Sequence, residues 1–276
     1  MKKIIAILFT LILIVVSVFA LTACDNDAIV VYTEAGFAPF EYYSGKNIVG
    51  VDVEIMNLVG QKLGKKVKFE SVDFDKIIDA VADGKLCNVG AAGISVTPER
   101  EEKVAFSNVY YTATLYVIYK ADQASTYVSA TTDNVDGVYW DSLAGKKIAV
   151  QSGTTADLFL ADELAEGGTL YGTNATDVQF KELAVAVADV KLGNSNVLII
   201  DELPAKKLIE NEPTLACAPL YYQGGAGEND EAAVDEYAIC VTKGQTELLK
   251  AINDVLAELG KDGIQALVNK HLGLGD

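Results

Sequence analysis

Segments with strand-like and helix-like patterns alternate along this chain, and that alternation limits its fold more than any other feature. The run 28–33 is rich in β-branched residues, and the apolar residues of 52–63 recur at the spacing of one helical face. A strand-like run at 67–72, a helical pattern at 74–82 and an apolar strand at 89–94 follow in order. This βαβαβ arrangement predicts a mostly parallel sheet covered by helices.

The same pattern recurs in the second half of the chain. A strand at 147–150 opens into a helix, a later helical pattern that includes Phe180 ends near Gly193, and a buried strand follows at 196–200. We therefore expect two α/β lobes. Ligands of open α/β sheets bind at the carboxyl ends of the strands, so the ligand site is expected at those ends.

Two segments are suited to connect the predicted lobes. The first, 113–120, is long and strand-like, and the second, 237–242, precedes a helical pattern at 248–259. Two lobes joined by two crossings form a hinged clamshell. The polar stretch 121–136, which follows the first crossing, has no functional interpretation from its residues.

The N-terminal residues predict where the protein resides. A basic start at 1–3, an apolar run at 4–20 and small residues before Cys24 are typical of a secretory signal peptide. A membrane-spanning helix is the alternative, since the apolar run is close to the minimum spanning length. The Leu-x-Ala-Cys ending resembles the bacterial lipoprotein box. That resemblance implies removal of 1–23, a lipid on Cys24, a short tether at 24–27 and an extracytoplasmic protein anchored to the cell membrane.

Composition excludes several classes of function. The net charge is −17, whereas a nucleic-acid-binding protein requires a basic surface, so we expect no nucleic-acid partner. Cys87, Cys217 and Cys240 remain besides Cys24, an odd number without metal-site spacing. We expect Cys87 and Cys240 to be buried thiols, with a bridge between them as the alternative. Because His271 is the only histidine, we expect no metal site, and we expect no cofactor.

Arg100 is the only arginine of the chain, since the 22 basic side chains are 21 lysines and this one residue. A guanidinium is a planar fork that binds a carboxylate through two parallel hydrogen bonds, which an ammonium group cannot do. The residues alone leave two interpretations open. Arg100 either binds a carboxylate or is a surface residue paired with its neighbours Glu99, Glu101 and Glu102.

A series of motifs gives the chain a resemblance to a known family. The most distinctive is Ala92-Gly93-Ile94-Ser95-Val96-Thr97-Pro98-Glu99-Arg100. The others are Phe37-Ala38-Pro39-Phe40-Glu41, Val49-Gly50-Val51-Asp52-Val53, Asp73-Phe74-Asp75, Phe106-Ser107-Asn108-Val109-Tyr110-Tyr111, Gln151-Ser152-Gly153-Thr154-Thr155, and Asp201 with Pro204 and Ala205. Over roughly 28–272 the chain resembles the family 3 bacterial solute-binding proteins, the polar amino acid receptors of ABC importers. It departs from their pattern at 85–89, which contains an extra residue and lacks an aspartate.

The resemblance implies a fold and partners. We expect a clamshell of the type II periplasmic-binding-protein class, with lobe 1 formed by 28–114 and a return segment at 235–276, and lobe 2 formed by 115–234. The expected protein is a monomer that binds a free amino acid and delivers it to the permease subunits of an ABC transporter.

The resemblance also implies roles for individual residues. The ligand carboxylate is assigned to Arg100, Ser95, Gly93, Thr155 and Thr154, the ligand ammonium to Asp201 and Gly93, and the side-chain pocket to Glu34, Phe37, Phe74 and Gln151. Structural alternatives remain for four of these residues. Thr154 and Thr155 are also suited to cap a helix, Asp201 to cap the helix expected at 202–210, and Phe74 to pack in the core.

The expected function is capture of a free polar L-amino acid by closure of the lobes. An acidic Glu34 with aromatic faces suits a cationic ligand side chain, and a neutral polar one fits nearly as well. A sensing receptor subunit is one alternative. A dehydratase-like enzyme on the same fold is another, for which Glu34 is the only acid–base candidate. We expect no enzyme activity and no catalytic residue.

Overall fold

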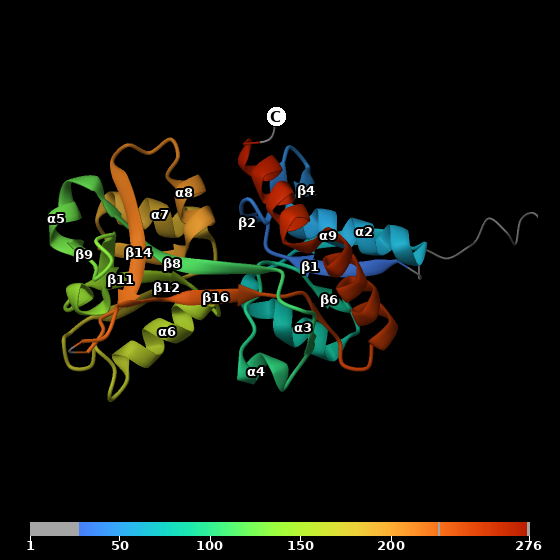
Figure 1. Cartoon of the computed structure of the whole chain (residues 1–276), viewed down its shortest axis with the longest axis horizontal. Coiled ribbons are helices and arrows are strands. Elements are labelled where there is room, and N and C mark those ends of the chain that lie inside the picture. The colour runs from blue at the N-terminus through green and yellow to red at the C-terminus, as the bar shows by residue number, and fades with distance from the viewer. Residues whose placement is uncertain (1–27, 226, 275–276) are drawn as a thin grey trace, which may run out of the picture.

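The computed structural model describes residues 28–225 and 227–274, which form two α/β lobes connected by two strands (Figure 1). The predicted signal peptide, Cys24 and the tether lie outside the described residues. Within the described part of the chain, no helix has the length and apolarity needed to cross a membrane. The two-lobed α/β architecture, with helices flanking each sheet, confirms the predicted fold class.

The sheet of lobe 1 has five strands in the order β5-β1-β6-β17-β7. Its strands are β1 (Ile29–Thr33), β5 (Val67–Ser71), β6 (Val89–Gly90), β7 (Ala105–Phe106) and β17 (Cys240–Val241). β1 is parallel to β5 and β6, as the βαβαβ pattern predicts, and β17 returns antiparallel to β6. A small separate sheet contains β2 (Gly36–Phe37), β3 (Glu41–Ser44) and β4 (Asn47–Val49).

Two apolar clusters hold helices against this sheet. The helices of lobe 1 are α2 (Val51–Leu63), η2 (Phe74–Lys76), α3 (Ile77–Asp83), α4 (Pro98–Glu101) and α9 (Thr246–Leu272). α2 and α9 lie side by side, and their residues Ile55, Met56 and Ile252 are fully buried in one cluster (Figure 1). Ile77 of α3 is buried in the second cluster together with Cys240 of β17. Burial of these side chains supplies the main stabilisation of the lobe.

The sheet of lobe 2 follows the order β12-β11-β13-β8-β14-β10-β9, with β15 on β14 and β16 on β8. Its strands are β8 (Tyr111–Lys120), β9 (Val128–Ala130), β10 (Asp136–Tyr139), β11 (Lys147–Gln151), β12 (Thr176–Phe180), β13 (Val197–Asp201), β14 (Leu215–Tyr222), β15 (Glu231–Ala232) and β16 (Val234–Tyr237). β11 is parallel to both β12 and β13, whereas β8 is antiparallel to β13. The sheet is therefore mixed, with a parallel half that resembles lobe 1.

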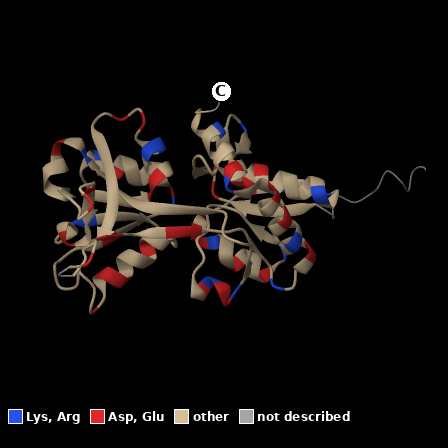
Figure 2. Ribbon diagram, in the orientation of Figure 1, with Lys and Arg blue, Asp and Glu red and all other residues tan. Residues whose placement is uncertain are grey.

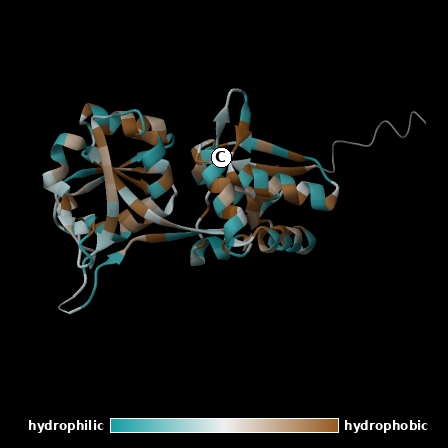
Figure 3. Ribbon diagram, turned by 45° about the horizontal axis from the view of Figure 1, so that its top comes forward, coloured by the Kyte–Doolittle hydropathy of each residue, from teal (hydrophilic) through white to brown (hydrophobic). Residues whose placement is uncertain are grey.

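The helices of lobe 2 are η3 (Ala121–Gln123), α5 (Ala124–Tyr127), η4 (Trp140–Leu143), α6 (Thr155–Leu164), α7 (Leu183–Leu192) and α8 (Glu202–Leu208). Trp140, Val150 and Leu160 share one buried cluster of this lobe. Hydrophobic residues are concentrated on the strands inside the lobes, and the connecting loops are largely hydrophilic (Figure 3).

Two antiparallel strands, β8 and β16, run between the lobes (Figure 1). Their register pairs Tyr111 with Tyr237 and Ala113 with Asp235. β8 continues into lobe 2, where it pairs with β13 and β14. The second crossing begins at Val234, three residues before the start predicted from the sequence.

Two local expectations and one alternative differ from the structure. Phe180 is the last residue of β12 and pairs with Gln151, so strand pairing prevails there over helical spacing, and α7 begins only at Leu183. The helix after Asp201 ends at Leu208 rather than at 210. Cys87 and Cys240 are free thiols, both buried, so the alternative of a bridge is wrong. The extra residue within 85–89 lies in the loop before β6, where β1 and β6 still pair.

Candidate functional site

One small cavity of about 10 Å³ lies between the two lobes. Nine of the ten residues that the resemblance places around the ligand line this cavity, together with Ala92. The nine are Glu34, Phe37, Phe74, Gly93, Ser95, Gln151, Thr154, Thr155 and Asp201. Arg100 is the tenth, and it lies beside the cavity without lining it.

The strand ends explain why distant residues meet here. Glu34 follows the end of β1, whereas Gln151 and Asp201 are the last residues of β11 and β13. Parallel strands in each lobe end at the same edge of their sheet, and the two edges face each other. The cavity therefore occupies the position where open α/β sheets bind ligands.

Arg100 connects the two lobes. Its NH1 donates to the Ser95 carbonyl at 2.6 Å, and its NH2 donates to the Gly153 carbonyl of lobe 2 at 2.8 Å. The guanidinium also lies over the Phe74 ring, 5.7 Å from its centroid, and the residue is buried. Burial lowers the pKa of Arg100 from its usual value. This geometry does not fit the interpretation of an exposed arginine paired with its acidic neighbours.

The two threonines at the start of α6 have different roles. Thr154 is the N-cap residue, and its Oγ1 accepts a hydrogen bond from the Asp157 N–H at 3.3 Å. Thr155 instead directs its hydroxyl into the space between the lobes, where it lies 3.2 Å from Ser95 Oγ and donates to Asp235. The first-turn amides of α6 have no intrahelical acceptors, so this helix start can bind an anion.

Gly93 has a backbone conformation that other residues rarely adopt, with φ 53°. A Cβ at this position would lie 2.8 Å from Phe37 Cε1, so glycine allows the close packing of the aromatic ring. The Gly93 N–H donates to Asp52 Oδ2 at 3.0 Å. A carboxylate from α2 therefore already accepts this N–H. Its carbonyl is the group that remains for a ligand.

Two carboxylates of the cavity each have an oxygen without a partner. Oε2 of Glu34 and Oδ1 of Asp201 are buried and have no hydrogen-bond partner among the described residues. Asp201 occupies the N-cap position of α8, as the structural alternative has it, but its side chain forms no capping hydrogen bond there. Burial is the largest cause that raises the pKa of both groups, and for Asp201 the neighbouring Asp235 adds to the rise.

Aromatic rings and an amide complete the cavity. Phe37 is buried against Phe40 and Tyr237, with ring centroids 6.0 and 6.2 Å away. Phe74 is half-buried and contacts both the lobe 1 core and Arg100, so its two interpretations coexist. Gln151 is buried and donates from Nε2 to the Lys181 carbonyl at 2.9 Å.

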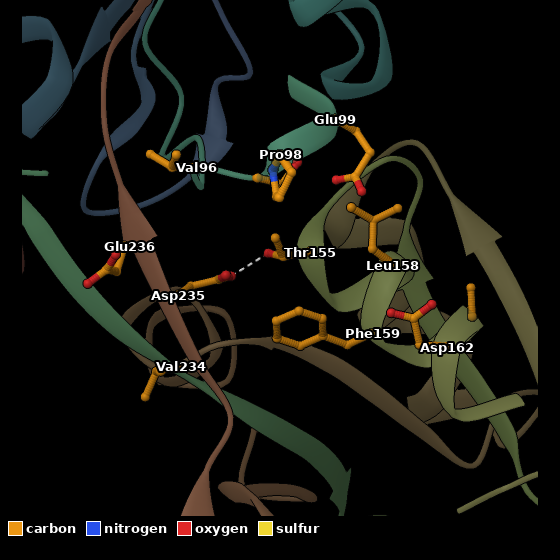
Figure 4. Close-up of a pocket in the computed structure, with 12 residues that line it drawn as sticks. Val96, Pro98, Glu99, Thr155, Leu158, Phe159, Asp162, Val234, Asp235 and Glu236 are labelled. Atoms are coloured by element: carbon orange, nitrogen blue, oxygen red, sulfur yellow. Dashed lines mark hydrogen bonds between the residues drawn. The ribbon is translucent and has the colours of Figure 1, made fainter. Parts of the chain in front are cut away.

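Asp235 is a site residue that the sequence interpretation missed. It is buried on β16, and its Oδ2 accepts the Thr155 hydroxyl bond drawn in Figure 4. On the other side of this pair, an open groove contains Pro98 from lobe 1 and Phe159 from lobe 2 (Figure 4). In the structure burial alternates strictly along 234–237, which places Asp235 on the buried face of the strand.

Charged residues are not confined to the cavity. Acidic and basic residues occur on both lobes (Figure 2). Within the described ranges no three His, Cys, Asp or Glu side chains are grouped so that they could hold a metal ion.

Comparison with known proteins places the chain in a family. The family model described as bacterial extracellular solute-binding proteins, family 3, matches residues 29–274. The chain is 28% identical to the arginine-binding extracellular protein ArtP of Bacillus subtilis strain 168, over 89% of each chain. It is 26% identical to the L-cystine-binding protein TcyJ of Escherichia coli K12, over 90% of this chain and 84% of TcyJ.

The structure of this chain is also similar to a solved structure. The amino acid ABC transporter substrate-binding protein AbpA of Streptococcus pneumoniae, bound to L-arginine, matches with a TM-score of 0.73 and 28% identity. The match covers 90% of this chain and 96% of AbpA. The matched family consists of bacterial extracellular solute-binding proteins, and these relatives bind arginine or cystine or, for AbpA, serve as the substrate-binding protein of an amino acid ABC transporter.

Proposed function

The chain belongs to the bacterial extracellular solute-binding proteins of family 3, and on that premise we propose that it captures a free cationic L-amino acid for an ABC importer. The ligand class is arginine, lysine or ornithine. The protein binds its ligand without chemical change, and the permease subunits of the importer take the ligand from it.

The observation that carries this proposal is the pair of unpartnered carboxylate oxygens in the cavity, Glu34 Oε2 and Asp201 Oδ1. A buried acceptor without a donor costs about 1–3 kcal/mol, and more when it is charged. A ligand with one ammonium group and a second cationic group would satisfy both acids. A neutral amino acid would leave the charge of Glu34 uncompensated.

The other end of the ligand is a carboxylate. In our proposal Arg100 exchanges one of its two backbone acceptors for this carboxylate, and the Thr155 end of α6 adds helix N-terminal amides. Phe37 and Phe74 flank the aliphatic part of the ligand and attract its cation through their ring faces. The Gly93 carbonyl is a further acceptor for the ammonium.

Closure of the lobes is part of the proposed function. The ligand would contact lobe 1 through Ser95 and Glu34 and lobe 2 through Thr155 and Asp201. In the open form the ligand can contact only one lobe at a time. It therefore has a higher affinity for the closed form and shifts the population toward it.

Two finer statements belong to the same proposal. We propose that Cys24 is lipidated and holds the protein at the outer face of the cell membrane, on the strength of the Leu-x-Ala-Cys ending. We also propose that the protein acts as a monomer. Labelling with a radioactive fatty acid tests the anchor, because Cys24→Ser should remove the label.

A thermal-shift panel tests the ligand class. We would screen the twenty amino acids, ornithine and cystine against the purified protein. A ligand at one hundred times its Kd stabilises the native state by about 2.7 kcal/mol, so arginine, lysine or ornithine should raise Tm by several degrees. A response to cystine alone would contradict the cationic class, and no response to any compound would contradict the function itself.

A further inference from the structure

The stretch 55–69 has a charge that is unlike the rest of this acidic chain. It contains four lysines and no acidic residue, whereas 39 of the 276 residues of the chain are Asp or Glu. One of the four, Lys62, forms a salt bridge with Glu258 of α9 at 2.7 Å. The other three lysines therefore give this part of lobe 1 a positive charge of its own.

These three lysines form one exposed surface, which we call the lysine surface. Its members are Lys65, Lys66 and Lys68. They line an open groove of about 620 Å³ that also contains Asn57 and Gln61. Lysine ammonium groups and side-chain amides all donate hydrogen bonds to oxygen. The groove is thus suited to anionic oxygen groups such as those of a phosphate ester.

The lysine surface lies beside the first described strand. The Ile29 N–H donates to the Lys66 carbonyl at 2.9 Å, and Ile29 pairs with Val67 where β1 and β5 begin in parallel. The distance to Cys24 is limited by covalent geometry, because the four residues 24–27 span at most about 14 Å. A lipid on Cys24 would therefore keep this edge of lobe 1 next to the membrane.

The lysine surface and the ligand cavity lie at opposite edges of the lobe 1 sheet. Lys68 is near the amino end of β5, whereas Glu34, which lines the cavity, follows the carboxyl end of the parallel strand β1. The basic carboxyl end of α2 lies at the end of lobe 1 that is remote from lobe 2 (Figure 2). A membrane contact at the lysine surface would thus direct the cavity edge away from the bilayer.

Two structural explanations account for part of the lysine surface. A cation such as Lys65 compensates the negative end of the dipole of α2, which ends at Leu63. Lys68 lies on β5, an edge strand of the sheet, and lysines on edge strands hinder unwanted strand pairing. Neither explanation requires that acidic residues be absent from the whole stretch 55–69. A contact with an anionic surface does require it.

We propose that the lysine surface binds the anionic phospholipid headgroups of the cell membrane and holds lobe 1 upright on the bilayer. Lysines close to an anionic bilayer are attracted to it, and the anchor makes this contact intramolecular, so a few lysines suffice. The bilayer repels most of the protein, since the chain has a net charge of −17. It also repels Asp25 and Asp27 of the tether, which the three lysines outweigh. The proposal rests on the lipid anchor of the proposed function, which supplies the proximity.

A lysine footprint on vesicles tests the contact. The chain from Cys24 onward, with Cys217→Ser, is coupled through the Cys24 thiol to a maleimide lipid, since Cys87 and Cys240 are buried. Lysines are then acetylated with a neutral reagent, and mass spectrometry measures the rate at each position. The rates are compared on vesicles of phosphatidylcholine alone and on vesicles that also contain phosphatidylglycerol.

The lysine surface should react at least threefold more slowly on the anionic vesicles than on the neutral ones. The rates of Lys147 and Lys191, which are exposed on lobe 2, should not differ between the two. The difference at Lys66 should disappear at 1 M salt, where the Debye length is about 3 Å. Equal rates for Lys66 on both kinds of vesicle at low salt would overturn the proposal.

A double variant tests whether charge causes the protection. In Lys65→Gln with Lys68→Gln the remaining Lys66 is the reporter, and its protection on anionic vesicles should fall at least twofold. Lys147→Gln with Lys191→Gln removes the same charge from lobe 2 and is the matched control. Undiminished protection of Lys66 in the first variant would mean that the tether alone brings it to the bilayer, and would overturn the proposal.

Other outcomes separate this proposal from the proposed function. Coupling to a lipid replaces lipidation in the cell, so a Cys24 without a fatty acid label would exclude the natural anchor, and the vesicles would still decide whether the lysine surface binds lipid. The double variant should bind arginine as the wild type does, because the lysine surface lies away from the cavity. Protection of Lys66 by millimolar inorganic phosphate in the uncoupled chain would assign the groove to free phosphate and overturn the membrane contact.

Discussion

The guanidinium of Arg100 is the residue-scale link between binding and closure. Its two donors are directed at carbonyls of opposite lobes, 2.6 Å from Ser95 O and 2.8 Å from Gly153 O. A ligand carboxylate would replace one of these carbonyls as a hydrogen-bond acceptor of the guanidinium. Arg100 would then bind the ligand with a donor that now connects the two lobes. Lysine, with a compact ammonium group, cannot serve two separated acceptors in one plane.

Replacement of Arg100 tests this dual role. Arg100→Lys should weaken arginine binding by at least tenfold, about 1.4 kcal/mol, because the bidentate contact is lost while the charge remains. Isothermal titration measures the affinity, and circular dichroism checks that the fold persists. Lys103→Arg, an exposed position one turn away, controls for a general effect of exchanging the two basic residues. An unchanged affinity in Arg100→Lys would exclude the carboxylate role.

Glu34 should determine the charge of the ligand side chain. Its Oε2 is buried without a partner, and burial raises its pKa, so an approaching cation would stabilise the ionised form. Glu34→Gln should weaken arginine binding by at least tenfold, and binding of glutamine should weaken less or improve. A competition titration of arginine against glutamine measures the ratio directly. The same loss for both ligands would mean that Glu34 supports the cavity without selecting charge.

The sequence predicts candidate residues better than their contacts. Asp201 stands at the end of an apolar strand, a position that a short local pattern reveals, whereas Glu34 and Gln151 were assigned through the family resemblance; all three line one cavity. The contact from Gly93 N–H to Asp52 could not be predicted, since it joins residues 41 positions apart and depends on how α2 packs. Asp235 was missed because a lone acid on a crossing strand has no motif.

At the scale of secondary structure, the start of α6 approaches lobe 1 closely. Gly153 precedes this helix with φ 79°, and a Cβ there would lie 3.1 Å from Asp75 Cα in the opposite lobe. This approach lets the helix N-terminus reach the cavity. Any side chain at the position would hold the lobes apart.

Gly153→Ala should therefore weaken ligand binding by about tenfold or more, because the closed form becomes strained. Gly172→Ala is the matched control, since Gly172 has φ 71° and open space around its Cα. Both variants carry the backbone cost of alanine in a left-handed conformation, but only the first meets the other lobe. Equal affinities for the two variants would show that the contact does not limit closure.

Element prediction succeeded where periodicity was long and failed at element ends. The helix predicted at 52–63 is α2 (Val51–Leu63), because several buried side chains repeat along one face. Phe180 has the spacing of a helical residue but lies in a parallel strand, since its pairing with Gln151 forms only when distant segments meet. The short return strand β17 likewise depends on partners from the first third of the chain.

At the scale of the whole molecule, the structure is a closed clamshell stabilised by contacts between its lobes. Arg100 to Gly153 and Ser95 to Thr155 are the inner contacts. At the rim, Lys181 of lobe 2 forms a salt bridge with Asp73 of lobe 1. The inner contacts overlap with the proposed ligand site, whereas the rim contact does not, so the rim pair can be altered without removing a ligand contact.

Reversal of this rim pair tests whether closure is linked to affinity. Lys181→Glu places two negative charges across the rim, which should favour the open form, enlarge the radius of gyration of the empty protein and weaken ligand binding about two- to fivefold. The double variant Asp73→Lys with Lys181→Glu restores an opposite-charge pair in the reverse orientation and should recover both values. Small-angle scattering and titration measure them, at low salt and again at 1 M salt, where screening should reduce the differences. A swapped pair that fails to recover affinity would mean that Lys181 acts through a local contact and not through closure.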